Sequence, residues 1–70
     1  MTTAQEEARN MLFAKYDTSF LDKKQTAKEL GGISLTSLDR MRQVGSISSR
    51  KILGQIRFSV TEVARYIADA

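Results

Sequence analysis

Thr36, Arg40 and Gln43 are the residues of this chain whose types and spacing best suit a chemical role. They are four and three residues apart, so on an α-helix they share one face. Leu38 and Met41 fall on the opposite side and predict the face that packs on a core. Hydroxyl, guanidinium and carboxamide groups on one helix face can hydrogen-bond base edges and phosphates. We therefore expect this helix to contact DNA.

The residue types that are missing exclude most catalytic and metal chemistry. The 70 residues include no cysteine and no histidine, which rules out a disulfide, a thiol nucleophile, a histidine base and a typical zinc site. The carboxylates Asp39, Glu62 and Asp69 are scattered and form no nucleophile–base set. We expect a protein that is not an enzyme and that holds no cofactor or metal.

The positive charge is concentrated in the part of the chain that contains the proposed contact helix. The net charge is +3, but residues 1–22 carry two basic and four acidic side chains, whereas residues 23–70 carry nine basic and four acidic ones. A basic domain favours a polyanionic partner, although a solvated surface with a mild excess of lysine is the plainer alternative. No apolar run is long enough to span a membrane, so no membrane partner is expected.

The first part of the chain predicts a separate helix. Apolar residues recur at helical intervals over residues 3–16, and Asp17-Thr18-Ser19 reads as a break. We expect a helix that docks on the rest of the chain; a self-association helix and a partly frayed arm are the alternatives. Residues 1–19 are thus an N-terminal helix or arm, and residues 20–70 form the second unit. The expected inward residues are Ala4, Ala8, Met11, Leu12 and Tyr16.

Two short helices joined by a glycine turn follow a short extended entry at Phe20 and Leu21. Asp22 with Gln25 predicts the capped start of a helix over 23–30, with Ala27 and Leu30 inward. Gly31 and Gly32 suit a left-handed turn, Ser34 caps a helix over 35–44, and Gly45 ends it. This order predicts a helix-turn-helix.

The pattern then changes to a hairpin and a last helix. Two β-prone runs, 49–53 and 55–58, flank Gly54, with Ile56 and Phe58 on one face and Gln55 and Arg57 on the other. Ser59 and Glu62 have capping-box spacing, and the next helix should bury an apolar stripe and end near Asp69. That stripe is Val60, Val63, Ala64 and Ile67. A hairpin directly after the proposed contact helix is a wing.

These residues, in this order, resemble a known family. From Phe20 on, the chain is similar to the winged helix-turn-helix excisionases of phages and mobile elements and to the AlpA-type regulators, whose fold is like the DNA-binding part of the MerR group. The matching residues are Ala27, Gly31-Gly32, Ile33-Ser34, Ser37-Leu38, Arg40-Met41, Gly45, Arg50-Lys51, Gly54, Ile56-Arg57-Phe58, Ser59, Glu62 and Tyr66-Ile67. The expected fold is mainly α with a small antiparallel β-hairpin, a MerR-like winged helix-turn-helix with an extra N-terminal helix.

The resemblance also implies a function and its partners. It implies a small sequence-specific protein that binds and bends double-stranded attachment-site DNA as an excisionase, or recombination directionality factor, and also regulates transcription. A tyrosine integrase and further copies of the protein on DNA are the implied partners. The implied location is the cytoplasm of a bacterium or phage-infected host, with the nucleoid.

The expected DNA contacts combine the helix and the wing. Thr36 and Ser37 suit phosphates, with a thymine methyl as the alternative for Thr36; Arg40 suits a guanine edge or a bidentate phosphate contact, and Gln43 an adenine or a phosphate. Basic residues of the wing suit the phosphates or the adjacent minor groove. Lys23, Lys24 and Lys28 rank as weak phosphate contacts. The full expected set is Lys24, Ser34, Thr36, Ser37, Arg40, Gln43, Arg50, Lys51, Gln55 and Arg57.

Three residues keep more than one interpretation. Asp39 either lies at the edge of the polar face, accepts from a cytosine amine, or orients Arg42 or Gln43. Leu35 contacts a thymine methyl, packs on the wing, or marks a protein-binding surface. Arg57 either contacts DNA or pairs with Glu62 or Asp69.

Other functions also stay open at this point. They are a stand-alone AlpA-type transcription regulator, the DNA-recognition piece of a phage packaging enzyme, and a protein-interaction module on a helix-turn-helix scaffold.

Overall fold

The computed structural model describes residues 3–69 and is mainly helical, with one small antiparallel sheet. The elements are α1 (Thr3–Tyr16), β1 (Phe20–Leu21), α2 (Lys23–Glu29), α3 (Leu35–Gln43), β2 (Arg50–Ile52), β3 (Gln55–Ser59) and α4 (Val60–Asp69). The strand order is β1-β3-β2, and both pairings are antiparallel. The expected mainly α class with a small antiparallel hairpin is confirmed. The short entry at Phe20 and Leu21 becomes a third strand, a pairing that was not predicted.

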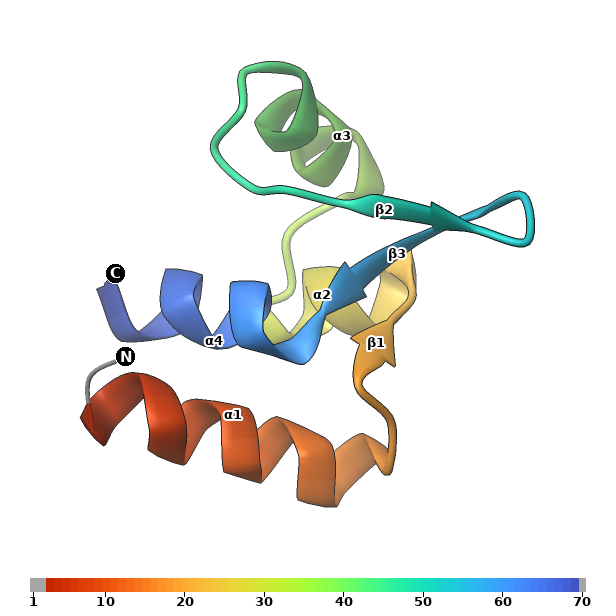
Figure 1. Ribbon diagram of the computed structural model, residues 1–70. Coiled ribbons are helices and arrows are strands. Elements are labelled where there is room, and N and C mark those ends of the chain that lie inside the picture. The colour runs from red at the N-terminus through yellow and green to blue at the C-terminus, as the bar shows by residue number, and fades with distance from the viewer. Residues whose placement is uncertain (1–2, 70) are drawn as a thin grey trace.

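The helices lie in layers around one core (Figure 1). α1 packs along α4, α2 lies beside β3, and α3 lies on the side away from α1. The buried apolar residues are Leu12, Leu21, Ala27, Leu38, Ile47, Phe58, Val60, Val63 and Ala64. They come from every described helix and from β1 and β3, so a chain this short is held by one shared core rather than by separate ones.

α1 contributes to this core through only part of its predicted apolar face. Leu12 is fully buried, and Ala8 and Tyr16 pack against the core. The prediction that Met11 faces inward is wrong, because its side chain is 51% exposed. Ala4, also expected inward, is exposed as well. α4 covers a narrower strip of α1 than the sequence periodicity suggested.

A polar contact ties the C-terminal end of α1 to α2. Lys15 Nζ lies 3.1 Å from Glu29 Oε2, and the Tyr16 hydroxyl donates to the same oxygen at 3.2 Å. The hydrogen bond from Lys15 to Glu29 raises the pKa of Lys15, against the opposing effect of desolvation. Tyr16 and Lys15 therefore fix the end of α1 that leads into β1.

Local capping signals set the ends of α2 and α3 as predicted. Asp22 Oδ1 accepts from the Gln25 N–H at 2.8 Å, and Gln25 Oε1 accepts from the Asp22 N–H at 3.1 Å. Gly31 and Gly32 both have positive φ, 98° and 77°, which lets the chain reverse at once into α3. Each helix ends one residue earlier than predicted, because Leu30 and Val44 are C-caps.

The hairpin and α4 also follow their sequence signals, with small shifts. β2 is shorter than the predicted run 49–53, and β3 extends to Ser59. Ser59 Oγ accepts from the Glu62 N–H at 3.0 Å and so caps α4. Val60, Val63 and Ala64 are buried, and Ile67 packs against the core.

Candidate nucleic-acid interface

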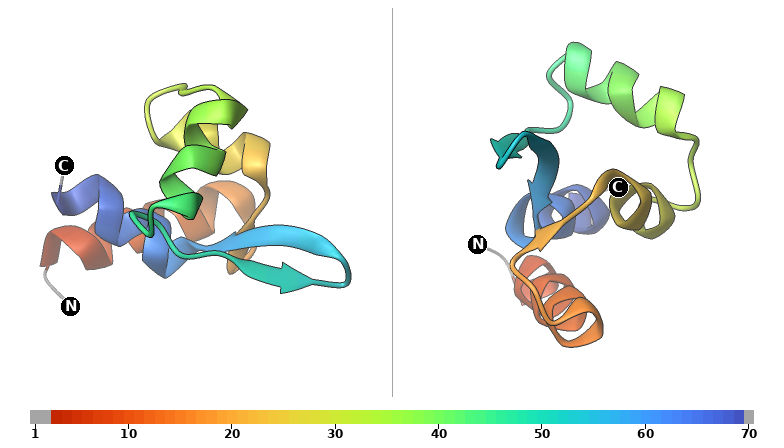
Figure 2. Two further views of the ribbon diagram at one scale, coloured as in Figure 1. Left: turned by 90° about the horizontal axis from the view of Figure 1, so that it is seen from above. Right: turned by 90° about the vertical axis from the view of Figure 1, so that its right-hand side faces the viewer.

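The outward face of α3 carries the three residues that its periodicity predicted. Thr36, Arg40 and Gln43 are exposed, whereas Leu38 is fully buried and Met41 packs against the core. α3 and the β2–β3 hairpin both lie on the side of the molecule away from α1 (Figures 1 and 2). The two segments expected to contact DNA therefore share one side of the fold.

Ser34 and Ser37 form the start of α3 and bond to each other. Ser34 Oγ accepts from the Ser37 N–H at 3.1 Å and donates to Ser37 Oγ at 3.0 Å. Both side chains are exposed. The role of Ser34 is thus to cap the helix, while the hydroxyl hydrogen of Ser37 is left to donate to an acceptor outside the protein.

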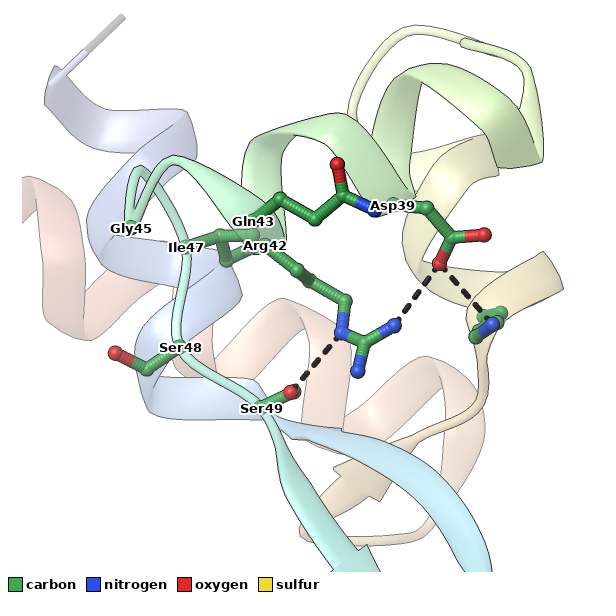
Figure 3. Close-up of a pocket in the computed structure, with 8 residues that line it drawn as sticks. Asp39, Arg42, Gln43, Gly45, Ile47, Ser48 and Ser49 are labelled. Atoms are coloured by element: carbon green, nitrogen blue, oxygen red, sulfur yellow. Dashed lines mark hydrogen bonds and ion pairs between the residues drawn. The ribbon is translucent and has the colours of Figure 1, made fainter.

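Asp39 is the centre of a network that joins three segments of the chain (Figure 3). Its Oδ1 lies 3.0 Å from Lys23 Nζ of α2 and 2.9 Å from Arg42 Nη1 of α3. Arg42 Nε also donates to Ser49 Oγ at 3.1 Å, just before β2. The interpretation of Asp39 as a residue that orients Arg42 is confirmed. The three-residue spacing of Asp39 and Arg42 on one helix is a sequence signal for their ion pair. The contact with Lys23 has no such signal, because Lys23 lies on a different helix.

This network also neutralises the acidic group nearest to the polar face of α3. The hydrogen bonds from Lys23 and then Arg42 hold the pKa of Asp39 below its ordinary value of 3.8. Its negative charge is offset by two cations within 3.0 Å, so it presents little repulsion to a phosphate. Lys23 is engaged here, whereas Lys24 and Lys28 are exposed.

The register of the hairpin places two arginines directly opposite each other. Arg50 on β2 pairs with Arg57 on β3, and Ile52 pairs with Gln55, so these four side chains share one face of the hairpin. Lys51 pairs with Ile56 and lies on the other face. Like charges directly across a ladder are destabilising, and an anion between them would relieve the repulsion.

Arg57 has partners other than those considered from the sequence. Its Nη1 lies 4.0 Å from Asp22 Oδ2, and its Nη2 donates to Gln55 Oε1. The alternative pairing with Glu62 is wrong, because that carboxylate bonds to Ser48 and Arg65. The side chain of Asp69 lies outside the described residues. Arg57 is partly exposed, with 33% of its side chain accessible to solvent.

A shallow groove connects the start of α2 with the hairpin. It is lined by Asp22, Lys23, Lys24, Leu35, Gln55, Ile56 and Arg57. Leu35, at the start of α3, is 42% exposed and lines this groove beside the hairpin. Three cations and one carboxylate give the groove a net positive charge, which suits the sugar–phosphate backbone of a nucleic acid.

Glu62 links α4 to the loop before β2. Its Oε2 accepts from the Ser48 N–H at 3.1 Å, and its Oε1 accepts from Arg65 Nε at 2.7 Å. Desolvation alone would raise the pKa of this carboxyl, but the hydrogen bonds from Arg65 and Ser48 outweigh it and hold the pKa of Glu62 below its ordinary value of 4.5. The predicted capping box with Ser59 therefore forms in one direction, from the Glu62 N–H to Ser59 Oγ.

Replacing Glu62 with glutamine is expected to destabilise the fold by roughly 1 kcal/mol at neutral pH, because the ionised carboxylate accepts both bonds. A depressed pKa means that this contribution is present above the unfolded-state pKa, near 4.5, and is lost as the pH falls through the folded-state value. Urea unfolding of both proteins at about pH 7 and about pH 3 measures the difference. Glu7→Gln, on the exposed part of α1, is the matched control. A difference that persists undiminished in acid would contradict this role.

Among the described side chains of residues 3–69, no three or more form a cluster suited to a metal ion. No helix in that described range is long and apolar enough to cross a membrane.

Comparison with protein-family models, with curated proteins and with solved structures finds no match to this chain. The relation to excisionases therefore stays a prediction from the sequence pattern.

Proposed function

We propose that this protein binds double-stranded DNA through a winged helix-turn-helix of the MerR-like type, with α3 as the recognition helix and β2–β3 as the wing. One observation carries the proposal: α3, whose polar face is exposed, and the hairpin, which carries the opposed arginines, both lie on the side of the molecule away from α1. The sequence supports it, since five basic and no acidic residues lie between Asp39 and Glu62. A surface of that charge suits a polyanion.

In this proposal the two elements have different tasks. α3 enters the major groove, where Arg40 donates two hydrogen bonds to a guanine edge and Gln43 hydrogen-bonds an adenine or a phosphate. Thr36 and Ser37, at the start of the helix, donate to phosphate oxygens. The network of Asp39 holds α3 at a fixed angle to α2 and to the strand entry, so it positions Arg40 without touching DNA.

The hairpin adds affinity that does not depend on sequence. Arg50 and Arg57 can take a phosphate between them, and Lys24 lies across the α2–hairpin groove from Arg57. Phosphate contacts of this kind set the register of a protein on the duplex, and base contacts specify the site. A domain this small reads few bases, so useful specificity requires several copies on repeated sites.

The biological role that we propose is that of an excisionase acting near the nucleoid with a tyrosine integrase, or of an AlpA-type transcription regulator. The DNA chemistry is the same in both. The genes next to the gene of this protein discriminate between the two roles: a neighbouring integrase gene would favour the excisionase.

A second candidate, a protein-interaction module, is favoured by Met11 and Phe13, which are 51% and 48% exposed on α1. A tight protein complex that is insensitive to salt would support this module, and salt-dependent binding to DNA would argue against it.

Replacing Arg40 with alanine is expected to lower the affinity for a selected duplex by about 1–3 kcal/mol, roughly fivefold to 150-fold, because a bidentate base contact is lost. The duplex is recovered by selection from a randomised library, and the affinity is measured by fluorescence anisotropy. Arg9→Ala is the matched control: it removes the same charge from α1, on the opposite side of the molecule. Absence of binding at low salt, or equal losses in the two variants, would overturn the proposal.

A further inference from the structure

Leu53, at the tip of the β2–β3 hairpin, is an apolar side chain that the fold does not use. It is 99% exposed and contacts no part of the core. The core would lose nothing if this position were polar, because burial of the side chain contributes no stability here.

The turn itself also disfavours a leucine at this position. Leu53 and Gly54 form a two-residue turn, and both have positive φ, 52° and 79°. Such turns favour asparagine, aspartate or glycine, because a branched side chain is strained in the left-handed region. Gly54 follows that rule and Leu53 breaks it. A strained and fully exposed leucine is therefore explained neither by packing nor by turn geometry, which points to a contact with another molecule.

The surroundings of Leu53 indicate the chemistry of that molecule. The stem of the hairpin carries Arg50, Lys51 and Arg57, and Arg50 directly faces Arg57. An apolar tip on a cationic stem matches a DNA minor groove, where phosphates line both edges and an apolar wedge can enter between base pairs. An anionic membrane is the other surface with this chemistry. A single leucine on a hairpin that lies on the same side of the molecule as α3 favours DNA, since a membrane contact needs a broad apolar face.

The dimensions of the hairpin are compatible with this contact. Paired strands lie about 4.8 Å apart, so a two-residue tip can approach a minor groove about 6 Å wide. The hairpin projects away from the helices (Figure 1), and three residues of strand separate its tip from the body of the fold. Leu53 can thus reach a groove while Arg50 and Arg57 stay level with the phosphates.

We propose that Leu53 is a wedge that enters the minor groove beside the site of α3, unstacks one base step and kinks the duplex. This inference rests on the proposed function. Pyrimidine–purine steps unstack most easily, so the wedge should favour such a step at a fixed distance from the bases that Arg40 contacts.

The test compares Leu53→Asn with Leu53→Met. Asparagine removes the apolar group and suits the left-handed turn, so this variant should be at least as stable as the parent protein; methionine keeps an apolar side chain. The probes are a duplex with 2-aminopurine at a central TA step, which reports unstacking, and a duplex with a fluorophore at each end, which reports bending by energy transfer. Anisotropy gives the affinity of each protein for the same DNA.

The parent protein and Leu53→Met should raise 2-aminopurine fluorescence and energy transfer. Leu53→Asn should raise neither signal, and its affinity for the same duplex should fall by less than about tenfold. Unstacking and bending that are equal in Leu53→Asn and the parent would overturn the wedge and leave DNA binding intact. Binding of the parent, but not of Leu53→Asn, to vesicles containing phosphatidylserine, without unstacking of DNA, would assign the tip to a membrane instead. Failure of the parent to bind DNA at low salt would overturn both proposals.

Discussion

The affinity of this protein for a random-sequence duplex is expected to fall by roughly 50-fold to 500-fold when the salt concentration rises from about 50 to about 200 mM. Each neutralised phosphate contributes about −0.9 to the slope of log affinity against log salt, and three to five cations on one side of the fold give a slope of about −3 to −4.5. Anisotropy titrations over a series of NaCl concentrations measure it. The cations are Lys24, Arg40, Arg50, Lys51 and Arg57.

Arg50→Gln locates this effect on the hairpin. The slope should weaken by about one unit, because one phosphate contact is lost. The free energy of unfolding should stay the same or rise, since the substitution removes the like charge opposite Arg57. Arg9→Gln removes the same charge from α1 and should leave the slope unchanged. A slope near zero in the parent protein would rule out a phosphate-binding surface, and equal slopes in the two variants would place that surface elsewhere.

Replacing Phe58 with alanine is expected to destabilise the fold by about 3–5 kcal/mol, which is a large fraction of its total free energy of unfolding. Phe58 is fully buried on β3 and pairs with Leu21 of β1, so it joins the sheet to the core. A chain of 70 residues has a total free energy of unfolding of only roughly 4–10 kcal/mol. Urea unfolding followed by circular dichroism measures the loss.

Two further variants make the result of Phe58→Ala specific. Leu53→Ala removes a large apolar side chain that is 99% exposed and should change the free energy of unfolding by less than about 0.5 kcal/mol. Phe58→Leu keeps most of the buried volume and should stay folded, with a loss of about 1.5 kcal/mol. Similar urea midpoints for Phe58→Ala and Leu53→Ala would contradict the placement of Phe58 in the core.

Most helix and turn boundaries could be predicted because their signals are local. The capping pair Asp22 and Gln25, the Gly31-Gly32 turn and the Ser34 cap each act within a few residues, and each is found where it was expected. The polar face of α3 followed from the 3.6-residue period in the same way, since Leu38 had to face a core.

Predictions failed where an inward face had to be matched to a neighbour. Met11 fits the helical period of α1, yet its side chain is half exposed because α4 covers only one strip of that helix. Thr26, by contrast, is polar and is fully buried. Periodicity gives the direction of a side chain, but the width of the buried strip depends on the shape of the element packed against it.

By itself the sequence determined the order of the elements, the outward direction of Thr36, Arg40 and Gln43, and the excess of positive charge on the second part of the chain. Periodicity, capping and charge are properties of neighbouring residues. Only the tertiary structure decided that Asp39 bonds Lys23, that Arg57 meets Asp22, and that Phe20 and Leu21 extend the sheet. These contacts join residues far apart in the chain, and their formation depends on how the helices and strands pack around the shared core.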